Sequence, residues 1–385
     1  MTVWEEPEIA AATIIDLPAV SRGGRRLLDA IFCAGRLSQA ELSRSLDLAQ
    51  PTVARLLAGF ADAGLVTLSA RAANRRGHPS VDAAINPDAL FTLGIALLGD
   101  RLSMLLLDAA GAVRGRRSIG HADEQRADMI AKIVRMRDEL LTDARVHYAQ
   151  LLGVGLGVSA FFTATPNMIV GPPALEAWTL VNFLPELEAA LGLPVMLEND
   201  GATAAIAEAR FGIGREARSF AYLHLTNGFG GAIVSNGKLF RGHFGNAGEF
   251  GGIWTVTGAD YPSLDHLLAR VRSADPAVDY PSVEAMTGMI DPDTPGVASW
   301  LDIAVPAFSS LCSILGYALD PGAIVLGGRL PPSIADMLVA RIAMPRAANR
   351  HGLAPPLPVV RRALVDDDAV ALGAALMPLE RALLL

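Results

Sequence analysis

The stretch LTNGFGGAIVSNG, residues 225–237, places three glycines between two apolar runs. Gly228, Gly230 and Gly231 form the kind of turn that brings backbone amides close to a phosphate. Such a loop belongs either to an enzyme that uses a nucleotide or to a protein of another class that has kept the loop.

Strand-like and helical stretches alternate on both sides of this loop. Strands are expected at 91–99, 101–111, 112–120 and 151–160, with a long helix over 123–149. A second copy of this pattern is expected to begin with the strand 194–200, followed by a helix over 201–211 and strands at 219–226, 230–235 and 322–328. The succession predicts a two-lobed α/β fold with a cleft between the lobes.

Composition narrows the class of protein. The chain has 385 residues, of which 51% are hydrophobic and 19% charged, as in globular proteins. No apolar run reaches the roughly 18 residues of a membrane span, and residues 1–20 carry four acids without Lys or Arg. Cys33 and Cys312 are too few for a disulfide framework. We expect a cytoplasmic protein with no membrane partner, opening with an acidic flexible arm over residues 1–20.

A basic segment follows the acidic arm. Residues 21–80 contain nine Arg and four acids, whereas the net charge of the whole chain is −8. A basic module on an acidic body favours binding of a polyanion, with a chance local excess of charge as the alternative.

The basic segment has the pattern of a helix-turn-helix. A helix is expected over 22–35, Ser38 and Glu41 form the capping box of a second helix, and Pro51 suits the first turn of a third. The third helix would present three side chains to base edges and phosphates in a major groove, namely Gln50, Thr52 and Arg55. An ordinary three-helix bundle with a polar face is the alternative.

Two expected strands, 65–70 and 81–86, would add a wing to this module. The loop between them carries Arg71, Arg75, Arg76 and His78. An Arg-rich tip suits insertion into a minor groove, where the potential is most negative. Operator DNA is therefore the expected partner, although a solvated charged loop would have the same composition.

Four stretches together resemble the ROK family, whose members are sugar kinases and sugar-responsive repressors. They are LENDGATAA (197–205), LTNGFGGAIVSNGKLFRG (225–242), GNAGEFGG (245–252) and LDPGAIVLGGRL (319–330), in that order. The resemblance implies an actin-like, sugar-kinase (ribonuclease H-like) body over residues 88–385, behind a winged helix-turn-helix domain over 21–87. It also implies a homodimer or homotetramer.

The resemblance assigns a sugar site to residues in the cleft. Asp200 takes the place of the carboxylate that accepts the proton of the sugar hydroxyl in kinases, although from the residues alone it would only cap a helix. Asn199 and Glu249 are the further sugar-binding residues that it implies. Asp265 matches a family Glu and is shorter by one methylene.

The first phosphate loop departs from the kinase pattern of an Asp followed by Gly-Gly-Thr-Lys. Ala96 replaces the acid, Leu98 the first glycine, and Asp100 the threonine, where its charge repels phosphate. Gly252 stands where family members have a zinc-binding His, and no cysteine follows. We therefore expect a vestigial kinase site without cofactor or metal, in which Gly228, Gly230 and Gly231 form a tight turn between strands.

These features favour a sugar-responsive DNA-binding regulator, expected to be a repressor. Two alternatives stay open. One is an ATP-dependent sugar kinase of the ROK family with an appended DNA-binding module. The other is a regulator without a small-molecule ligand.

Overall fold

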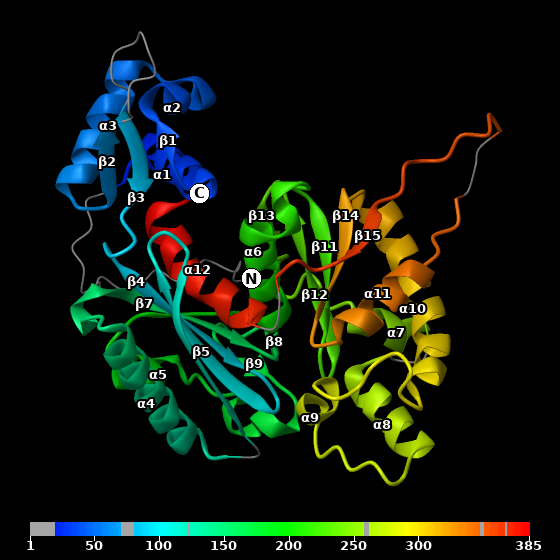
Figure 1. The fold of residues 1–385 in the computed structure, drawn as a ribbon. Coiled ribbons are helices and arrows are strands. Elements are labelled where there is room, and N and C mark those ends of the chain that lie inside the picture. Colours follow the sequence, from blue (N-terminus) through cyan, green and yellow to red (C-terminus); the bar gives the residue numbers. More distant parts are fainter. Residues whose placement is uncertain (1–19, 71–80, 122–123, 258–261, 347–349, 366–367) are drawn as a thin grey trace.

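The structure is a computed structural model that describes residues 20–70, 81–121, 124–257, 262–346, 350–365 and 368–385. A small N-terminal domain stands above a body of two lobes, each built on a five-stranded sheet (Figure 1). The predicted two-lobed α/β architecture is confirmed.

The N-terminal domain packs three helices against a small antiparallel sheet. The helices are α1 (Arg22–Ala34), α2 (Gln39–Leu46) and α3 (Gln50–Asp62), and the strands follow the order β1 (Leu37–Ser38), β3 (Val81–Ile85), β2 (Val66–Ala70). Leu27, Ile31, Leu42, Val53 and Leu57 are buried between them. The helical spacing read from the sequence is confirmed, because these apolar side chains form one core.

The first lobe has the sheet order β10-β7-β4-β5-β6. Its strands are β4 (Phe91–Leu97), β5 (Arg101–Asp108), β6 (Val113–Gly120), β7 (Leu151–Val158) and β10 (Val195–Asn199). Helices α4 (Arg126–Ala144) and α5 (Leu184–Leu191) cover one face, and α12 (Ala369–Leu383) covers the other. A short hairpin, β8 (Phe161–Phe162) and β9 (Ile169–Val170), follows β7.

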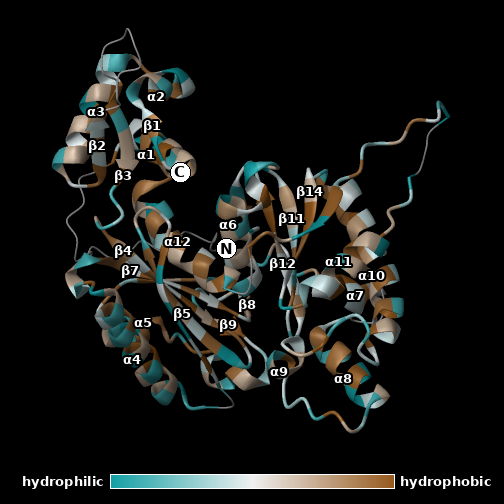
Figure 2. Ribbon diagram, viewed as in Figure 1, coloured by the Kyte–Doolittle hydropathy of each residue, from teal (hydrophilic) through white to brown (hydrophobic). Residues whose placement is uncertain are grey.

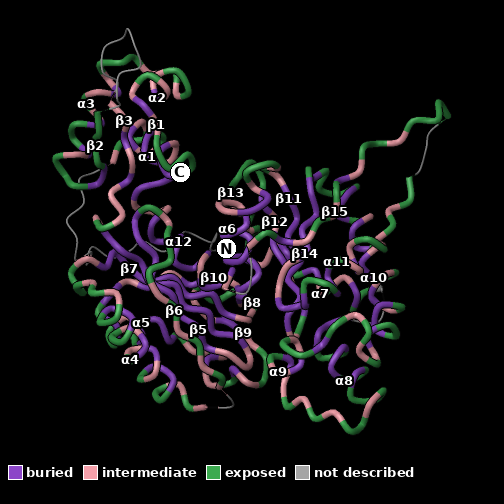
Figure 3. Tube along the Cα trace, in the orientation of Figure 1, coloured by how far each residue is buried: buried purple, intermediate pink, exposed green. Residues whose placement is uncertain are grey.

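The second lobe repeats this topology with the order β13-β12-β11-β14-β15. Its strands are β11 (Phe220–Leu225), β12 (Phe229–Ser235), β13 (Lys238–Phe240), β14 (Ala323–Gly328) and β15 (Val359–Arg362). Helix α6 (Asp200–Phe211) lies on one face, and the other carries α7 (Gly251–Thr257), α8 (Leu264–Ala274), α9 (Val283–Thr287), α10 (Val297–Leu319) and α11 (Pro332–Arg341). Apolar residues concentrate along both sheets, which are the most deeply buried parts of the chain (Figures 2 and 3).

One expectation about the repeat is wrong. The strand 194–200 does not open the second copy, because β10 pairs in parallel with β7 and completes the first sheet. Helix α5 returns the chain to the edge of that sheet, and the second copy begins at β11.

Helices α6 and α12 cross where the two lobes meet. Gly373 of α12 lies so close to α6 that a Cβ there would come within 1.7 Å of the Thr203 carbonyl oxygen. The two helix backbones therefore touch, which only glycine permits at this point.

Among the described residues, α10 is the one helix long and apolar enough to cross a membrane by length and composition. Its Trp300, Phe308 and Leu311 are buried in the second lobe. Such packing is typical of a core helix in a globular domain.

Candidate functional site

The N-terminal domain exposes the start of α3. Ser38 caps α2, and its hydroxyl accepts a hydrogen bond from the Glu41 amide while the Glu41 carboxylate accepts one from the Ser38 amide, at 3.2 and 2.7 Å. The predicted capping box is thus present. Gln50 and Arg55 are exposed and Thr52 is half-buried. Their role in binding DNA stays a prediction.

The other predicted DNA-binding residues lie on the wing. Its two strands, β2 and β3, are paired antiparallel as expected. The tip residues Arg71, Arg75, Arg76 and His78 lie outside the described residues. Their predicted contacts with a minor groove therefore stay a prediction.

Asp200 lies at the N-terminus of α6 with its side chain largely buried. One carboxylate oxygen accepts a hydrogen bond from the Gly201 amide at 2.8 Å, and the other accepts one from the Ser159 hydroxyl. The carboxylate is therefore fixed in one orientation, as a group must be if it is to bind or deprotonate a ligand hydroxyl.

Glu249 lies close enough to Asp200 for their charges to interact. Desolvation, and then the negative charge of Asp200, raise the pKa of Glu249 to about 7, although its side chain keeps access to solvent. The two carboxylates form a polar centre with hydrogen-bond acceptors for vicinal hydroxyls.

His224 was not identified from the sequence. It lies on β11, 3% exposed, with its Nε2 atom 3.8 Å from a carboxylate oxygen of Asp200. Neither ring nitrogen has a hydrogen-bond partner among the described residues. Burial lowers the pKa of His224 despite the nearby Asp200 charge, so the ring is neutral at pH 7. In the sequence, the feature that could have indicated this residue is a histidine inside an otherwise apolar strand.

The other two predicted sugar ligands have structural partners. The Asn199 side chain caps α6 by accepting a hydrogen bond from the Ala202 amide and donates one to the Ala160 carbonyl, each at 3.0 Å. Asp265 opens α8, and its carboxylate accepts a hydrogen bond from the Asn227 amide at 3.4 Å. Desolvation raises the pKa of Asp265, opposed by the Asn227 hydrogen bond. Sugar binding by either residue stays a prediction.

An arginine lies between the two loops that would hold phosphates in a kinase. Arg329 follows β14, and its guanidinium donates to both oxygens of Asp100 in the other lobe, at 2.7 and 3.3 Å. It also donates to the Asn227 side-chain oxygen at 3.1 Å and pairs with Glu284. The Arg329 side chain is only 6% exposed. We call this group the interlobe cluster; its residues tie one lobe to the other.

The glycine stretch has a smaller turn than expected. Gly228 lies in the turn between β11 and β12, but Gly230 and Gly231 are already inside β12. A Cβ at Gly231 would come within 2.1 Å of the Tyr222 carbonyl oxygen, so packing requires this glycine. The expectation that all three residues form the turn is therefore wrong.

Metal and nucleotide groups were expected to be absent. No set of three or more His, Cys, Asp or Glu side chains within the described ranges is arranged to hold a metal ion. The expectation of no metal and no cofactor stays a prediction.

The N-terminal domain is joined to the body by the other end of α6. Arg210 in the last turn of this helix pairs with Asp29 of α1 and Glu380 of α12, at 2.6 and 2.5 Å. The Arg210 side chain is 11% exposed. One helix thus begins at Asp200 and ends at the joint with the N-terminal domain.

Comparisons with known proteins agree with both parts of the chain. Residues 92–260 match the ROK family, and residues 24–69 match the IclR helix-turn-helix domain. An uncharacterized protein of Sinorhizobium fredii is 27% identical over 95% of this chain and 93% of its own length.

Two relatives with named functions match over shorter regions. The glucokinase of Streptomyces coelicolor is 31% identical over 43% of this chain and 50% of its own length. The xylose repressor of Caldicellulosiruptor bescii is 26% identical over 56% of this chain and 54% of its own length. The chain thus aligns with about half the length of these two relatives.

A solved structure supports the fold. The ROK family transcriptional regulator described as a homolog of the E. coli MLC protein superposes with a TM-score of 0.63 and 21% identity, over 94% of this chain and 95% of that one. The body therefore has the sugar-kinase-like, actin-like fold. Residues 92–260 thus carry a ROK family domain, which follows an N-terminal helix-turn-helix domain over residues 24–69.

Proposed function

We propose that this protein is a sugar-responsive transcriptional regulator, acting as a repressor. The observation that carries the proposal is helix α6, which starts at the acidic group around Asp200 and ends at Arg210, the joint with the helix-turn-helix domain. A ligand at one end can thus act on DNA binding at the other. The similarity to a xylose repressor supports this combination of functions.

DNA recognition is assigned to the start of α3 and to the wing. Gln50, Thr52 and Arg55 would contact base edges and phosphates in the major groove. The wing arginines would enter the adjacent minor groove. A homodimer or homotetramer would place two such modules on two half-sites.

Sugar recognition is assigned to the cleft. Asp200 and Glu249 supply acceptors for vicinal hydroxyls, and neutral His224 supplies one donor and one acceptor. A sugar hydroxyl would give the buried imidazole the partner that it lacks among the described residues. Asn199 and Asp265 would border the site.

Regulation requires that the sugar bind one arrangement of the lobes better than another. A changed lobe angle would move α6, and Arg210 would carry the movement to Asp29 in α1. The DNA-binding modules of a dimer would then change their spacing, and the affinity for an operator would change with it.

The interlobe cluster argues against phosphoryl transfer. Arg329 bridges the two loops through Asp100 and Asn227, and the carboxylate of Asp100 would repel the phosphates of ATP. Asp200 is nevertheless oriented as a base would be, and a glucokinase is among the relatives. We infer a vestigial kinase site.

The decisive experiment measures DNA, sugar and their coupling together. Binding sites are selected from a random DNA pool, and the affinity is measured by fluorescence anisotropy with and without each of a panel of pentoses and hexoses. At least one sugar should change the affinity in the wild type and leave it unchanged in Asp200→Ala. Arg76→Ala should weaken binding and its dependence on salt. Release of ADP from ATP and a sugar, lost in Asp200→Ala, would establish the kinase instead.

A further inference from the structure

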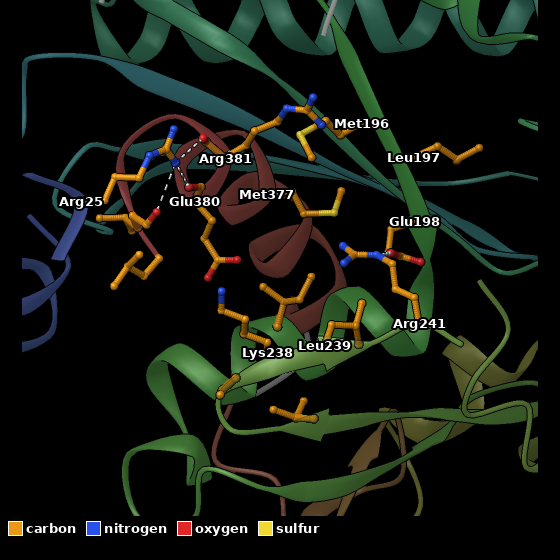
Figure 4. A pocket seen from close by; sticks show the side chains of 16 residues that line it. Arg25, Met196, Leu197, Glu198, Lys238, Leu239, Arg241, Met377, Glu380 and Arg381 are labelled. Atoms are coloured by element: carbon orange, nitrogen blue, oxygen red, sulfur yellow. Dashed lines mark hydrogen bonds and ion pairs between the residues drawn. The ribbon is translucent and has the colours of Figure 1, made fainter. Parts of the chain in front are cut away.

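A cavity lies where the N-terminal domain meets both lobes. Its volume is about 640 Å³, within the range of small-molecule sites. Figure 4 shows its lining, which comes from α1, β10, α6, the β12–β13 hairpin and the end of α12. Neither Asp200, Glu249 nor any member of the interlobe cluster lines it, so it is separate from the cleft.

One part of the lining is apolar. Met196, Leu239 and Met377 face the cavity from β10, β13 and α12 (Figure 4). Thioether and aliphatic side chains adapt to flat or irregular apolar groups. This surface would accept the hydrocarbon part of a ligand.

The other part of the lining carries positive charge. The Arg241 guanidinium is paired with Glu198 at 2.8 Å, and Glu380 is held by Arg210. Arg25 donates to three main-chain oxygens at the end of α12, the shortest bond being 2.6 Å to the carbonyl of Arg381. These carbonyl oxygens at the C-terminal end of α12 satisfy the donors and partly offset the charge of Arg25, which pairs with no carboxylate among the described residues.

The side chains of Arg381 and Lys238 have neither carbonyl nor carboxylate partners among the described residues. The Nη1 atom of Arg381 is buried and has no hydrogen-bond partner among the described residues. Neither residue forms an ion pair within the part of the chain that the structure describes. Lys238 is exposed and Arg381 is half-buried, so the accessible nitrogens of both side chains can pair with an anion in the cavity.

We propose that this cavity binds a small organic anion, a carboxylate or phosphate ester with an apolar body. The anionic oxygens accept hydrogen bonds from Arg381 and Lys238 beside the positive charge of Arg25, and the apolar body lies on Met196 and Met377. Neutral sugars do not meet this requirement, since hydroxyl groups leave the charges uncompensated. The site therefore takes a different class of ligand from the cleft.

Such a ligand would also stiffen the joint between the N-terminal domain and the body. It would contact the end of α12, to which Arg25 of α1 is bonded, and β13 of the second lobe. That the anion would change the affinity for DNA rests on the proposed function. That the anion binds in this cavity does not.

The test uses the full chain with phenyl phosphate as probe and benzyl alcohol as its neutral counterpart, measured by isothermal titration calorimetry. We expect phenyl phosphate to bind, and Arg381→Met and Lys238→Met each to weaken it about tenfold, as loss of a charge-assisted hydrogen bond does. Arg341→Met removes an exposed charge from α11 and serves as the matched control. Lys238 is exposed, so its variant remains informative if Arg381→Met fails to fold.

Several results would overturn the proposal. They are no binding of phenyl phosphate, equal binding of benzyl alcohol, or unchanged affinity in both Arg381→Met and Lys238→Met. Loss of binding in Asp200→Ala would place the probe in the cleft, and the proposal would fail while the proposed function stood. Unchanged binding of phenyl phosphate in Asp200→Ala would support the anion site. This would hold even if the protein bound neither sugar nor DNA, in which case only the proposed function would fail.

Discussion

Replacing Arg329 by Met tests whether the interlobe cluster holds the lobes together. The guanidinium is 6% exposed and bonds both oxygens of Asp100, which is itself 17% exposed. Breaking a buried pair costs about 3–5 kcal/mol because it leaves the other charge uncompensated. Water can reach Asp100 in part, which reduces the expected loss to about 2–3 kcal/mol. Glu284 is half exposed and adds less.

The loss is measured as the free energy of unfolding in urea, followed by tryptophan fluorescence. Arg362→Met is the matched control, because Arg362 forms a solvent-accessible ion pair with Asp336 at 3.0 Å in the same lobe. That pair should contribute less than about 1 kcal/mol. The double variant carries Arg329→Met and Asp100→Asn. Its loss of stability should be smaller than the sum of the two single losses, because both substitutions break the same ion pair.

Two outcomes would refute this reasoning. One is a loss in Arg329→Met no larger than that in Arg362→Met. The other is additive losses in the double variant, which would mean that Arg329 and Asp100 stabilise the protein independently.

Three further predictions concern other parts of the molecule. Arg210→Met should lower the free energy of unfolding by about 3 kcal/mol and abolish the effect of sugar on DNA affinity. Arg361→Met, which breaks an exposed ion pair, should change neither the thermal unfolding nor the DNA affinity measured by anisotropy. The pKa of Glu249 is about 7, and its ionised form accepts hydrogen bonds from hydroxyl groups. Calorimetry should therefore show the affinity for sugar rising up to about tenfold from pH 6 to pH 8. In Glu249→Gln the affinity should not depend on pH over this range. Ser38→Ala should cost about 1 kcal/mol in thermal unfolding through loss of the α2 cap, while Ser45→Ala should be neutral.

Local signals in the sequence predicted most of the secondary structure. The capping box of Ser38 and Glu41 and the apolar spacing of α1 act over a few residues, so they can be recognised without the fold. The motif around Asp200 likewise predicted a strand followed by a helix.

Long-range contacts could not be predicted in this way. Arg329 and Asp100 are far apart in sequence, and nothing local to either residue indicates that they pair. The place of β10 in the first sheet depends on pairing with β7, and the apolar pattern of a buried strand does not specify its neighbour. His224 lies near Asp200 only because α6 packs close to β11, and the sequence does not show this contact.

The contact between Gly373 and the Thr203 carbonyl limits how the lobes can move. Where two helix backbones touch, one cannot slide along the other without a steric clash. Shear between α6 and α12 is therefore excluded near this point, and rotation about it is left. Rotation about this point is opposed at the other end of α6, where Arg210 is paired with Glu380 of α12. The two contacts clamp the helices together, so a tilt that begins in the cleft would carry α12 with α6 and reach Asp29 and Arg25 of α1 through both helices.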